Sequence, residues 1–475
     1  MADLLSTLYS SANAMRAHSA ALDIVGRNMA NVNNPAYARQ RVVYGDKGSV
    51  NTPLGVQSLG LEAVGIQQMR DTLLDGEVVT ETSNTAVFDA QTNYLSQAQT
   101  ALGQGVFGDP STVETISSNS KLPAGIGASL DAFFNAWQSY ATDPTATTAK
   151  QQLIGATDDV INKIHTADTR LADIALTPAA TANTLTSQMD TKIGTVNGLL
   201  TTIAGLNRQI GQAEIINPGS AVDLRDQRQA KLEELAGYID FKTVPQTSGQ
   251  VGIQVKDNAV PANTVDLVNL ATVQGTLSRN GANYQWTPTS GAASTLAVTG
   301  GELAGLQQVG NTVQGYRTQL DTLVSTLVAR VNTAYNSAAN GDFFTAAGTT
   351  GATIARTATT ATVVAANAAS GAAANDNALA VAAIAHDTTF LGGTPTQAFS
   401  KIVMNVAQGV STNDNRLSDQ KSLSDLLKSQ RSSYGGVSLD EEAADMLRYQ
   451  RAYQASAKIL SVVDGLMQTV MDALR

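Results

Sequence analysis

One feature near the C-terminal end constrains this chain more than any other: an apolar residue that returns every seven positions. The first heptad position holds Leu439, Met446, Tyr453, Leu460, Met467 and Leu474, and the second holds Tyr449, Ser456, Val463 and Val470. Five such repeats are typical of a long helix that packs lengthwise against other helices. Ser438 and Glu441 have the spacing of a capping box, so the helix is expected to begin at Leu439.

The N-terminal end carries a looser version of the same repeat. The repeating positions are Leu8, Met15, Leu22 and Met29, with Leu5 beside them. The sequence therefore predicts a helix of about 30 residues that stops near Asn33-Asn34-Pro35, because the residue before a proline avoids the helical region.

The charges of the two ends are complementary. Residues 1–41 contain four Arg and two Asp, a net charge of +2, whereas residues 437–475 contain four basic and six acidic residues, a net charge of −2. We interpret the two helices as partners, within one chain or between chains. The alternative is that they are ordinary amphipathic ends of a large helical protein, but slim, Ala-rich helices gain most of their stability from lateral packing.

The middle of the chain predicts an α+β multidomain protein with a nested layout. The terminal helices (1–41 plus 437–475) enclose a mainly helical body (42–237 plus 302–436), and a small β domain (238–301) is inserted into that body. Within the body, residues 42–80 favour strands or an extended connector, and two helices are expected around 376–410 and 415–433. The Ala/Thr/Gly-rich stretch 341–374 is compatible with short strands or with an irregular loop.

Composition argues against several classes of function. The net charge of −10 disfavours nucleic-acid binding, which needs a basic surface. No Cys and three separated His leave little from which to build a metal site. The glycines at 103, 105 and 108 form a GxGxxG string, but it lacks the preceding strand of a nucleotide-binding turn. We therefore expect no enzyme activity, no cofactor or metal, and no membrane insertion, and the N-terminus does not read as a cleaved signal peptide.

The two ends together resemble a known family. The resemblance is to the paired signatures of bacterial flagellar rod, hook and hook-associated axial proteins. The N-terminal signature is similar to residues 20–40, AALDIVGRNMANVNNPAYARQ, and the C-terminal one to residues 438–460, which begin SLDEEAADMLRYQRAY. Interior stretches, among them DLRDQR at 223–228 and Phe343-Phe344, are similar to the hook-associated members. The family usually has Gly after the signature proline where this chain has Ala36, so the local turn is expected to differ.

The resemblance implies a structural protein of the flagellum that forms the first part of the hook–filament junction and serves motility. It implies that copies of the chain assemble with one another in a ring or helix, with hook protein below this assembly and hook-associated protein 3 above it. It also implies secretion by the flagellar type III export machinery with the help of a dedicated chaperone. The alternatives are a hook or distal rod subunit, or a secreted binding module or adhesin that presents the β insertion.

Two sets of residues are predicted to matter for assembly. The heptad pattern predicts the packing surface Leu5, Leu8, Met15, Leu22, Met29, Leu439, Met446, Tyr449, Tyr453, Leu460, Val463 and Met467. The resemblance adds a signature turn at Asn31, Asn33, Pro35 and Tyr37.

Overall fold

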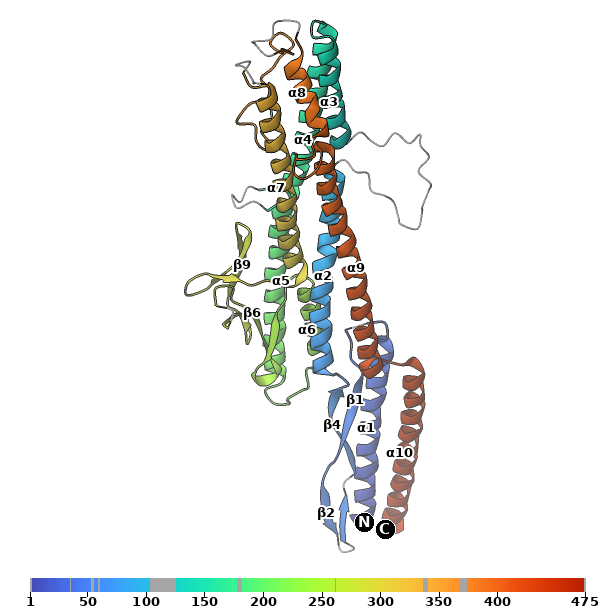
Figure 1. Ribbon diagram of the computed structural model, residues 1–475. Coiled ribbons are helices and arrows are strands. Elements are labelled where there is room, and N and C mark those ends of the chain that lie inside the picture. The colour runs from blue at the N-terminus through green and yellow to red at the C-terminus, as the bar shows by residue number, and fades with distance from the viewer. Residues whose placement is uncertain are drawn as a thin grey trace.

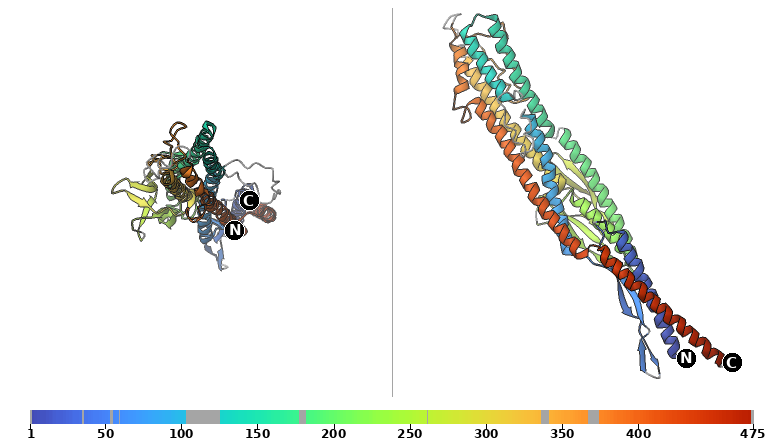
Figure 2. Two further views of the ribbon diagram at one scale, coloured as in Figure 1. Left: turned by 45° about the horizontal axis from the view of Figure 1, so that its top comes forward. Right: turned by 90° about the vertical axis from the view of Figure 1, so that its right-hand side faces the viewer.

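The computed structural model describes the chain except residues 1, 35, 53–54, 59, 103–124, 177–181, 261, 336–340, 367–373 and 474–475. The molecule is elongated, with both termini side by side at one end (Figures 1 and 2). The two terminal helices and a β-hairpin region form a narrow stalk, and the remaining elements form a longer body above it (Figure 1). We use "stalk" for residues 2–68 and 439–473 and "body" for residues 72–435.

The stalk contains two helices and four short strands. Its elements are α1 (Ala2–Ala30), β1 (Gln40–Asp46), β2 (Ser49–Thr52), β3 (Gly55–Ser58), β4 (Leu61–Gln68) and α10 (Leu439–Ala473). Strand β1 pairs antiparallel with β4, and β2 pairs with β3 at the tip of the same hairpin. Both β1 and β4 contact α1 and so lie beside it in the stalk. The sequence pattern assigned residues from 42 onward to the body. The predicted domain boundaries remain predictions.

The body is a bundle of long helices. It comprises α2 (Thr72–Ala101), α3 (Ile126–Thr142), α4 (Thr147–Ile174), α5 (Thr184–Ala213), α6 (Val222–Ala236), α7 (Gly301–Tyr335), α8 (Asp376–Ala383) and α9 (Pro395–Gly435). Helix α2 packs against both α7 and α9. The predicted break between helices at 410–415 is wrong, because α9 is continuous there. The interruption lies before Pro395, where Thr394 and Gln397 form the capping box that starts α9.

Two small antiparallel sheets project from one side of the body (Figure 1). Their strands are β5 (Lys242–Pro245), β6 (Val251–Lys256), β7 (Thr264–Asn269), β8 (Thr272–Val273), β9 (Gly275–Asn280), β10 (Asn283–Pro288) and β11 (Ser294–Leu296). The first sheet has the order β5-β6-β7-β8 and the second β11-β10-β9. Trp286 and Leu277 of these sheets belong to the same hydrophobic core as α5 and α7. The predicted fold class, a mainly helical α+β chain with terminal helices and inserted strands, is confirmed.

The end of the body farthest from the stalk is closed by an aromatic cluster. Phe133 and Trp137 of α3 meet Phe343 and Phe344, and the Trp137 and Phe343 ring centroids lie 5.0 Å apart at 61°. Such edge-on pairs of buried rings stabilise a contact beyond the area that they bury. The Phe343-Phe344 pair therefore ties the segment after α7 to the first helix that follows residue 124.

Candidate assembly surface and its joint to the body

The terminal helices α1 and α10 pack against each other within one chain, the intrachain arrangement of the two that the sequence allowed. Helix α1 buries Ala17, Ala21, Ile24 and Val25, and α10 buries Val463 in the last third of its length. Alanines on the buried face allow the backbones to approach closely, but they bury little apolar area. The stalk is therefore held by a thin apolar seam, which leaves much of each helix surface available to neighbours.

The predicted packing residues do not all lie on this seam. On α1, Leu8, Met15, Leu22 and Met29 are half-buried and Leu5 is exposed. On α10, Met446, Tyr449, Leu460 and Met467 are half-buried, Val463 is buried, and Leu439 and Tyr453 are exposed. Both repeats thus lie mostly at the border of the seam, and Val463 is the one predicted packing residue among these that is buried.

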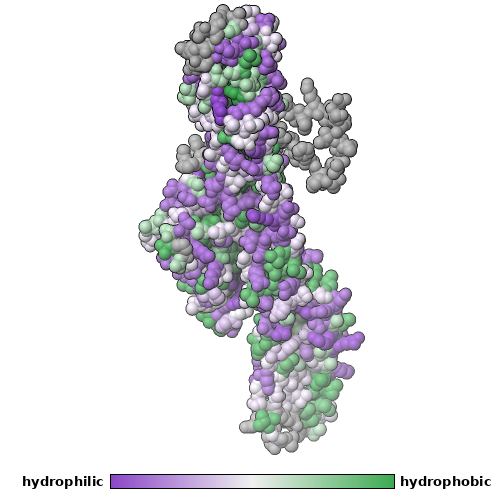
Figure 3. All heavy atoms as spheres, in the orientation of Figure 1, coloured by the Kyte–Doolittle hydropathy of each residue, from purple (hydrophilic) through white to green (hydrophobic). Residues whose placement is uncertain are grey.

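A second apolar row on α10 was missed by the heptad reading. Ile459, Val462 and Leu466 are 48%, 51% and 49% exposed and follow i, i+3, i+7 spacing, so they share one face of the helix. Leu5 and Tyr9 are also exposed on α1. Figure 3 shows hydrophobic side chains over the stalk on a surface that is otherwise largely polar. The helical spacing alone could have found this row, but it is weaker than the seven-residue repeat beside it. We call Ile459, Val462 and Leu466 the outer stripe.

The two signature segments meet in a buried polar network. The Asn28 side chain donates to Glu442 at 3.0 Å and to the Gln40 carbonyl at 2.9 Å, and it accepts from Tyr37 Oη at 2.8 Å. Arg39 donates through Nε to Glu442 at 2.7 Å. Burial raises the pKa of the Tyr37 hydroxyl above its ordinary value, so it stays a hydrogen-bond donor at neutral pH. The network locks the start of α10 to the end of α1.

This network gives one acidic residue at the start of α10 a specific partner. Glu442 is 1% exposed and forms an ion pair with Arg39, a contact in addition to the favourable position of an acid at a helix N-terminus. Among the signature residues, Tyr37 joins the network, Asn31 donates to the Arg27 carbonyl at 2.9 Å, and Asn33 is exposed. Pro35 lies outside the described residues, as do the glycines of the GxGxxG string. Asn28, Arg39 and Glu442 all lie within the signature runs, and only their tertiary contacts distinguish them from their neighbours.

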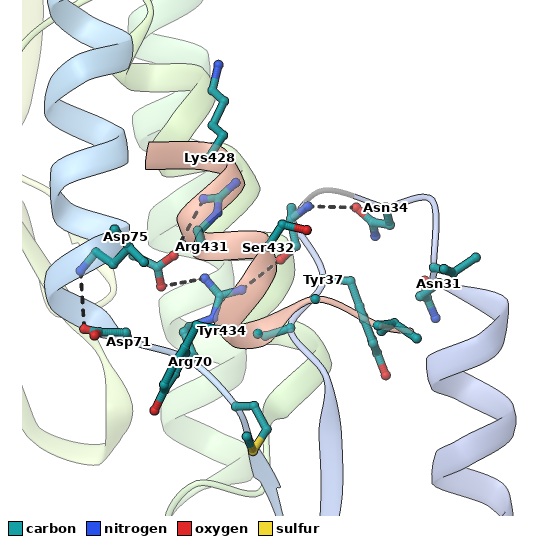
Figure 4. A pocket seen from close by; sticks show the side chains of 18 of the residues that line it. Asn31, Asn34, Tyr37, Arg70, Asp71, Asp75, Lys428, Arg431, Ser432 and Tyr434 are labelled. Carbon is teal, nitrogen blue, oxygen red and sulfur yellow. Dashed lines mark hydrogen bonds and ion pairs between the residues drawn. The ribbon is translucent and has the colours of Figure 1, made fainter. Parts of the chain in front are cut away.

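A joint connects the stalk to the body beside a cavity of about 410 Å³ (Figure 4). Three chain segments meet here: residues 31–39, 69–71 and 435–438. The backbone N–H of Arg39 donates to Gly435 at 2.9 Å, and that of Met69 donates to the Arg39 carbonyl at 2.8 Å. The cavity wall carries both acids and bases, including Asp75, Glu233 and Arg431. The joint is therefore a polar contact region, in contrast with the apolar core of the body.

Comparison with known proteins identifies the chain. A family model described as the helical domain of flagellar hook-associated protein FlgK matches residues 111–354, just over half of the 475 residues. The chain belongs to the FlgK family of flagellar hook-associated proteins. A second model, for the C-terminal part of flagellar basal body rod FlgEFG proteins, matches residues 428–473, the end of α9 and α10. Membership in the FlgK family confirms the resemblance carried by the two ends and the expected structural role in the flagellum.

Curated relatives agree with this family. The flagellar hook-associated protein 1 of Bacillus subtilis strain 168 is 23% identical over 97% of this chain and 96% of its own length. The protein of the same name from Salmonella typhimurium is 22% identical over 50% of this chain, a match that spans 38% of the relative. A solved structure of the flagellar hook junction protein FlgK from Burkholderia pseudomallei matches with a TM-score of 0.45 and 17% identity, covering 57% of this chain and 46% of that one.

Two properties of the described residues concern membranes and metal ions. Within that part of the chain, no helix combines the length and hydropathy needed to cross a bilayer. The described residues also contain no cluster of His, Asp and Glu arranged to hold a metal ion.

Proposed function

We propose that this FlgK-family chain forms the first part of the hook–filament junction, and that its copies assemble through the outer stripe of the stalk. The observation that carries the proposal is the exposure of Ile459, Val462 and Leu466 after α1 and α10 have paired. Contiguous exposed apolar side chains on a helix favour burial against another protein surface. Adjacent stalks in a ring would supply that surface without any change in the body.

The proposed partners follow from the same role. Hook protein lies below the ring, hook-associated protein 3 lies above it, and the subunit reaches the tip through the flagellar type III export machinery with a dedicated chaperone. The name of the B. subtilis relative, hook-associated protein 1, supports this position, as does the match of α10 to the C-terminal model of rod-type axial proteins.

The first experiment mixes purified protein with isolated hooks and examines the tips by electron microscopy. A short zone of limited length at the distal tip, with monomer left in solution, is the expected result. Tubes that grow without limit would instead identify a hook-type or rod-type subunit. Deletion of residues 439–475 should abolish binding to the tip, since it removes α10 and the outer stripe together.

A point variant tests the outer stripe itself. We expect Leu466→Asp to reduce tip occupancy about tenfold or more, because a carboxylate placed in an apolar contact costs more than about 1.4 kcal/mol. Gln468→Asp is the matched control, since this exposed residue lies two positions further along α10 and so on the far side of the helix. Equal occupancy for Leu466→Asp and wild type would contradict the proposed surface.

A further inference from the structure

The orientation of the stalk relative to the body needs an explanation that apolar packing does not supply. Among the described residues, the hydrophobic core of the body includes none from α1, α10 or β1–β4. The stalk and body therefore do not share that core, and side-chain hydrogen bonds and ion pairs cross the joint between them. Because α10 has 35 residues, it is about 50 Å long, and a rotation of about 10° at the joint moves its far end by about 9 Å.

One side chain in the joint contacts three separate segments. Arg70, which lies between β4 and α2, donates through Nη1 to Asp75 of α2 at 2.8 Å. Through Nη2 it donates to Asp226 of α6 at 2.7 Å and to the carbonyl of Ala36 at 2.8 Å. Ala36 belongs to the turn that leads from α1 to β1. A planar guanidinium is suited to this task because its donors point in fixed directions.

One acceptor on the body side, Asp75, has a second partner besides Arg70. Asp75 lies 3.6 Å from Arg431 of α9, and Arg431 also pairs with Glu233 of α6. In Figure 4, Arg70 and Arg431 approach Asp75 from different elements. Asp75 and Asp226 are each 6% exposed, so water does not compete strongly for them. Arg70 thus connects the turn of the stalk to two buried carboxylates of the body.

We propose that Arg70 is the positioning residue that fixes the angle between the stalk and the body. Its bond to Ala36 and its ion pairs to Asp75 and Asp226 hold the turn of the stalk against α2 and α6. The other side-chain contacts across the joint also end on α6. Asp223 accepts from Gln40 at 2.9 Å and lies 3.6 Å from Arg27, an ion pair between exposed side chains. The Val222 carbonyl accepts from Gln68 at 2.9 Å, and the backbone N–H of Ala38 donates to Asp226. In an assembled ring, this angle would decide where each outer stripe meets its neighbour.

The test measures the angle in the free monomer. Because the chain contains no Cys, cysteines introduced at the exposed positions Thr201 on α5 and Gln454 on α10 can carry a donor and an acceptor dye. Single-molecule energy transfer then reports the distance between body and stalk. We expect a narrow distribution for wild type and a distribution at least twice as broad for Arg70→Gln.

Two further variants make the result specific. Arg70→Lys should give an intermediate width, since one ammonium group cannot reach all three acceptors, and it replaces Arg70→Gln if that variant does not fold. Arg279→Gln is the control, because it removes an arginine–carboxylate pair between β9 and Asp190 of α5, neither of which belongs to the joint. A folded Arg70 variant with the wild-type width would overturn the proposal. Since hooks are absent from this assay, its outcome is independent of the tip-binding test.

Discussion

Three consecutive acidic residues at the start of α10 show how much a residue's role depends on its surroundings. Asp440 and Glu441 are exposed, whereas Glu442 is buried between Arg39 and Asn28. Consecutive helix positions point about 100° apart, so only one of the three can face α1. The exposed acids still favour the helix N-terminus through the dipole. Glu442 instead contributes a buried contact whose loss would remove one hydrogen-bond acceptor from both Arg39 and Asn28.

At the residue scale we predict a pH-dependent contribution from Asp226. Burial raises the pKa of this carboxyl to about 6, although Arg70 and the backbone N–H of Ala38 act in the opposite direction and Asp223 adds to the increase. The native chain therefore binds this proton at a higher pH than the unfolded chain does. This group therefore raises the free energy of unfolding by about 2 kcal/mol as the pH falls from 7 to 4.5. The contribution is lost as the pH rises through 6.

The measurement compares the free energy of unfolding of wild type and Asp226→Asn by denaturant titration at pH 7.5 and 4.5. The free energy of unfolding of wild type, relative to that of Asp226→Asn, should be larger at pH 4.5 than at pH 7.5. Asp173→Asn serves as the control, because Asp173 is an exposed residue of α4 and does not act on the pKa of Asp226. A difference that does not change with pH would show that Asp226 titrates as it does in the unfolded chain.

At the scale of elements, the low-complexity segment after α7 forms turns where the sequence allowed either strands or an irregular loop. Two short motifs of the same kind recur, Thr350-x-x-Thr353 and Thr359-x-x-Thr362. In each, the hydroxyls of the two threonines bond to each other and the second accepts from the backbone N–H of the first. The residues that follow, Ile354 and Val363, are buried. Threonine side chains thus close these two turns, while backbone bonds join residues 343–345 to residues 355–357.

The crossing of α7 over α2 gives the prediction at this scale. A Cβ at Gly305 would lie 2.5 Å from the Val87 carbonyl oxygen and 2.8 Å from the Ala90 Cβ, so the two helices would have to separate. We expect Gly305→Ala to lower the free energy of unfolding by about 1–3 kcal/mol. Gly315→Ala, in the same helix with open space around its Cβ position, should raise it by up to about 1 kcal/mol. Thermal or denaturant unfolding followed by circular dichroism checks both, and equal effects would contradict a close crossing.

For the whole molecule, the hydrophobic core defines which parts depend on one another. The core extends from Val87 to Val406 and includes Ile253 and Trp286 of the inserted sheets. The insertion is therefore packed onto the body, with Asn197 of α5 bonding both the N–H and the carbonyl of Leu277 at 2.9 Å. The stalk contributes no described residue to this core and has only its thin seam and polar network.

We accordingly predict that a fragment of residues 72–436 folds without the stalk. It should show strong helical circular dichroism and a cooperative thermal transition, and it should fail to bind hook tips. The full chain under the same conditions is the reference. A fragment that binds a hydrophobic dye and melts without a cooperative transition would show that the stalk stabilises the body after all.

The sequence by itself determined the features that depend on near neighbours. The α10 heptads, its capping box and the stop of α1 each involve residues within a few turns of one another, and they predicted the two terminal helices. The alternation around Val251, Ile253 and Val255 likewise predicted the inserted strands. The paired end signatures were enough to indicate the family.

Only the tertiary structure decided which faces of these elements are used. Four features depend on segments that are distant in the sequence. They are the burial of the alanine row of α1 in place of its repeat, the burial of Glu442, the exposure of the outer stripe and the contact of Arg70 with three segments. Asn28 and Glu442 are 414 positions apart, and Arg70 and Asp226 are 156 apart. Periodicity shows that a helix has an apolar face, but the burial of a particular residue is set by the shape and charge of the segment that packs against it.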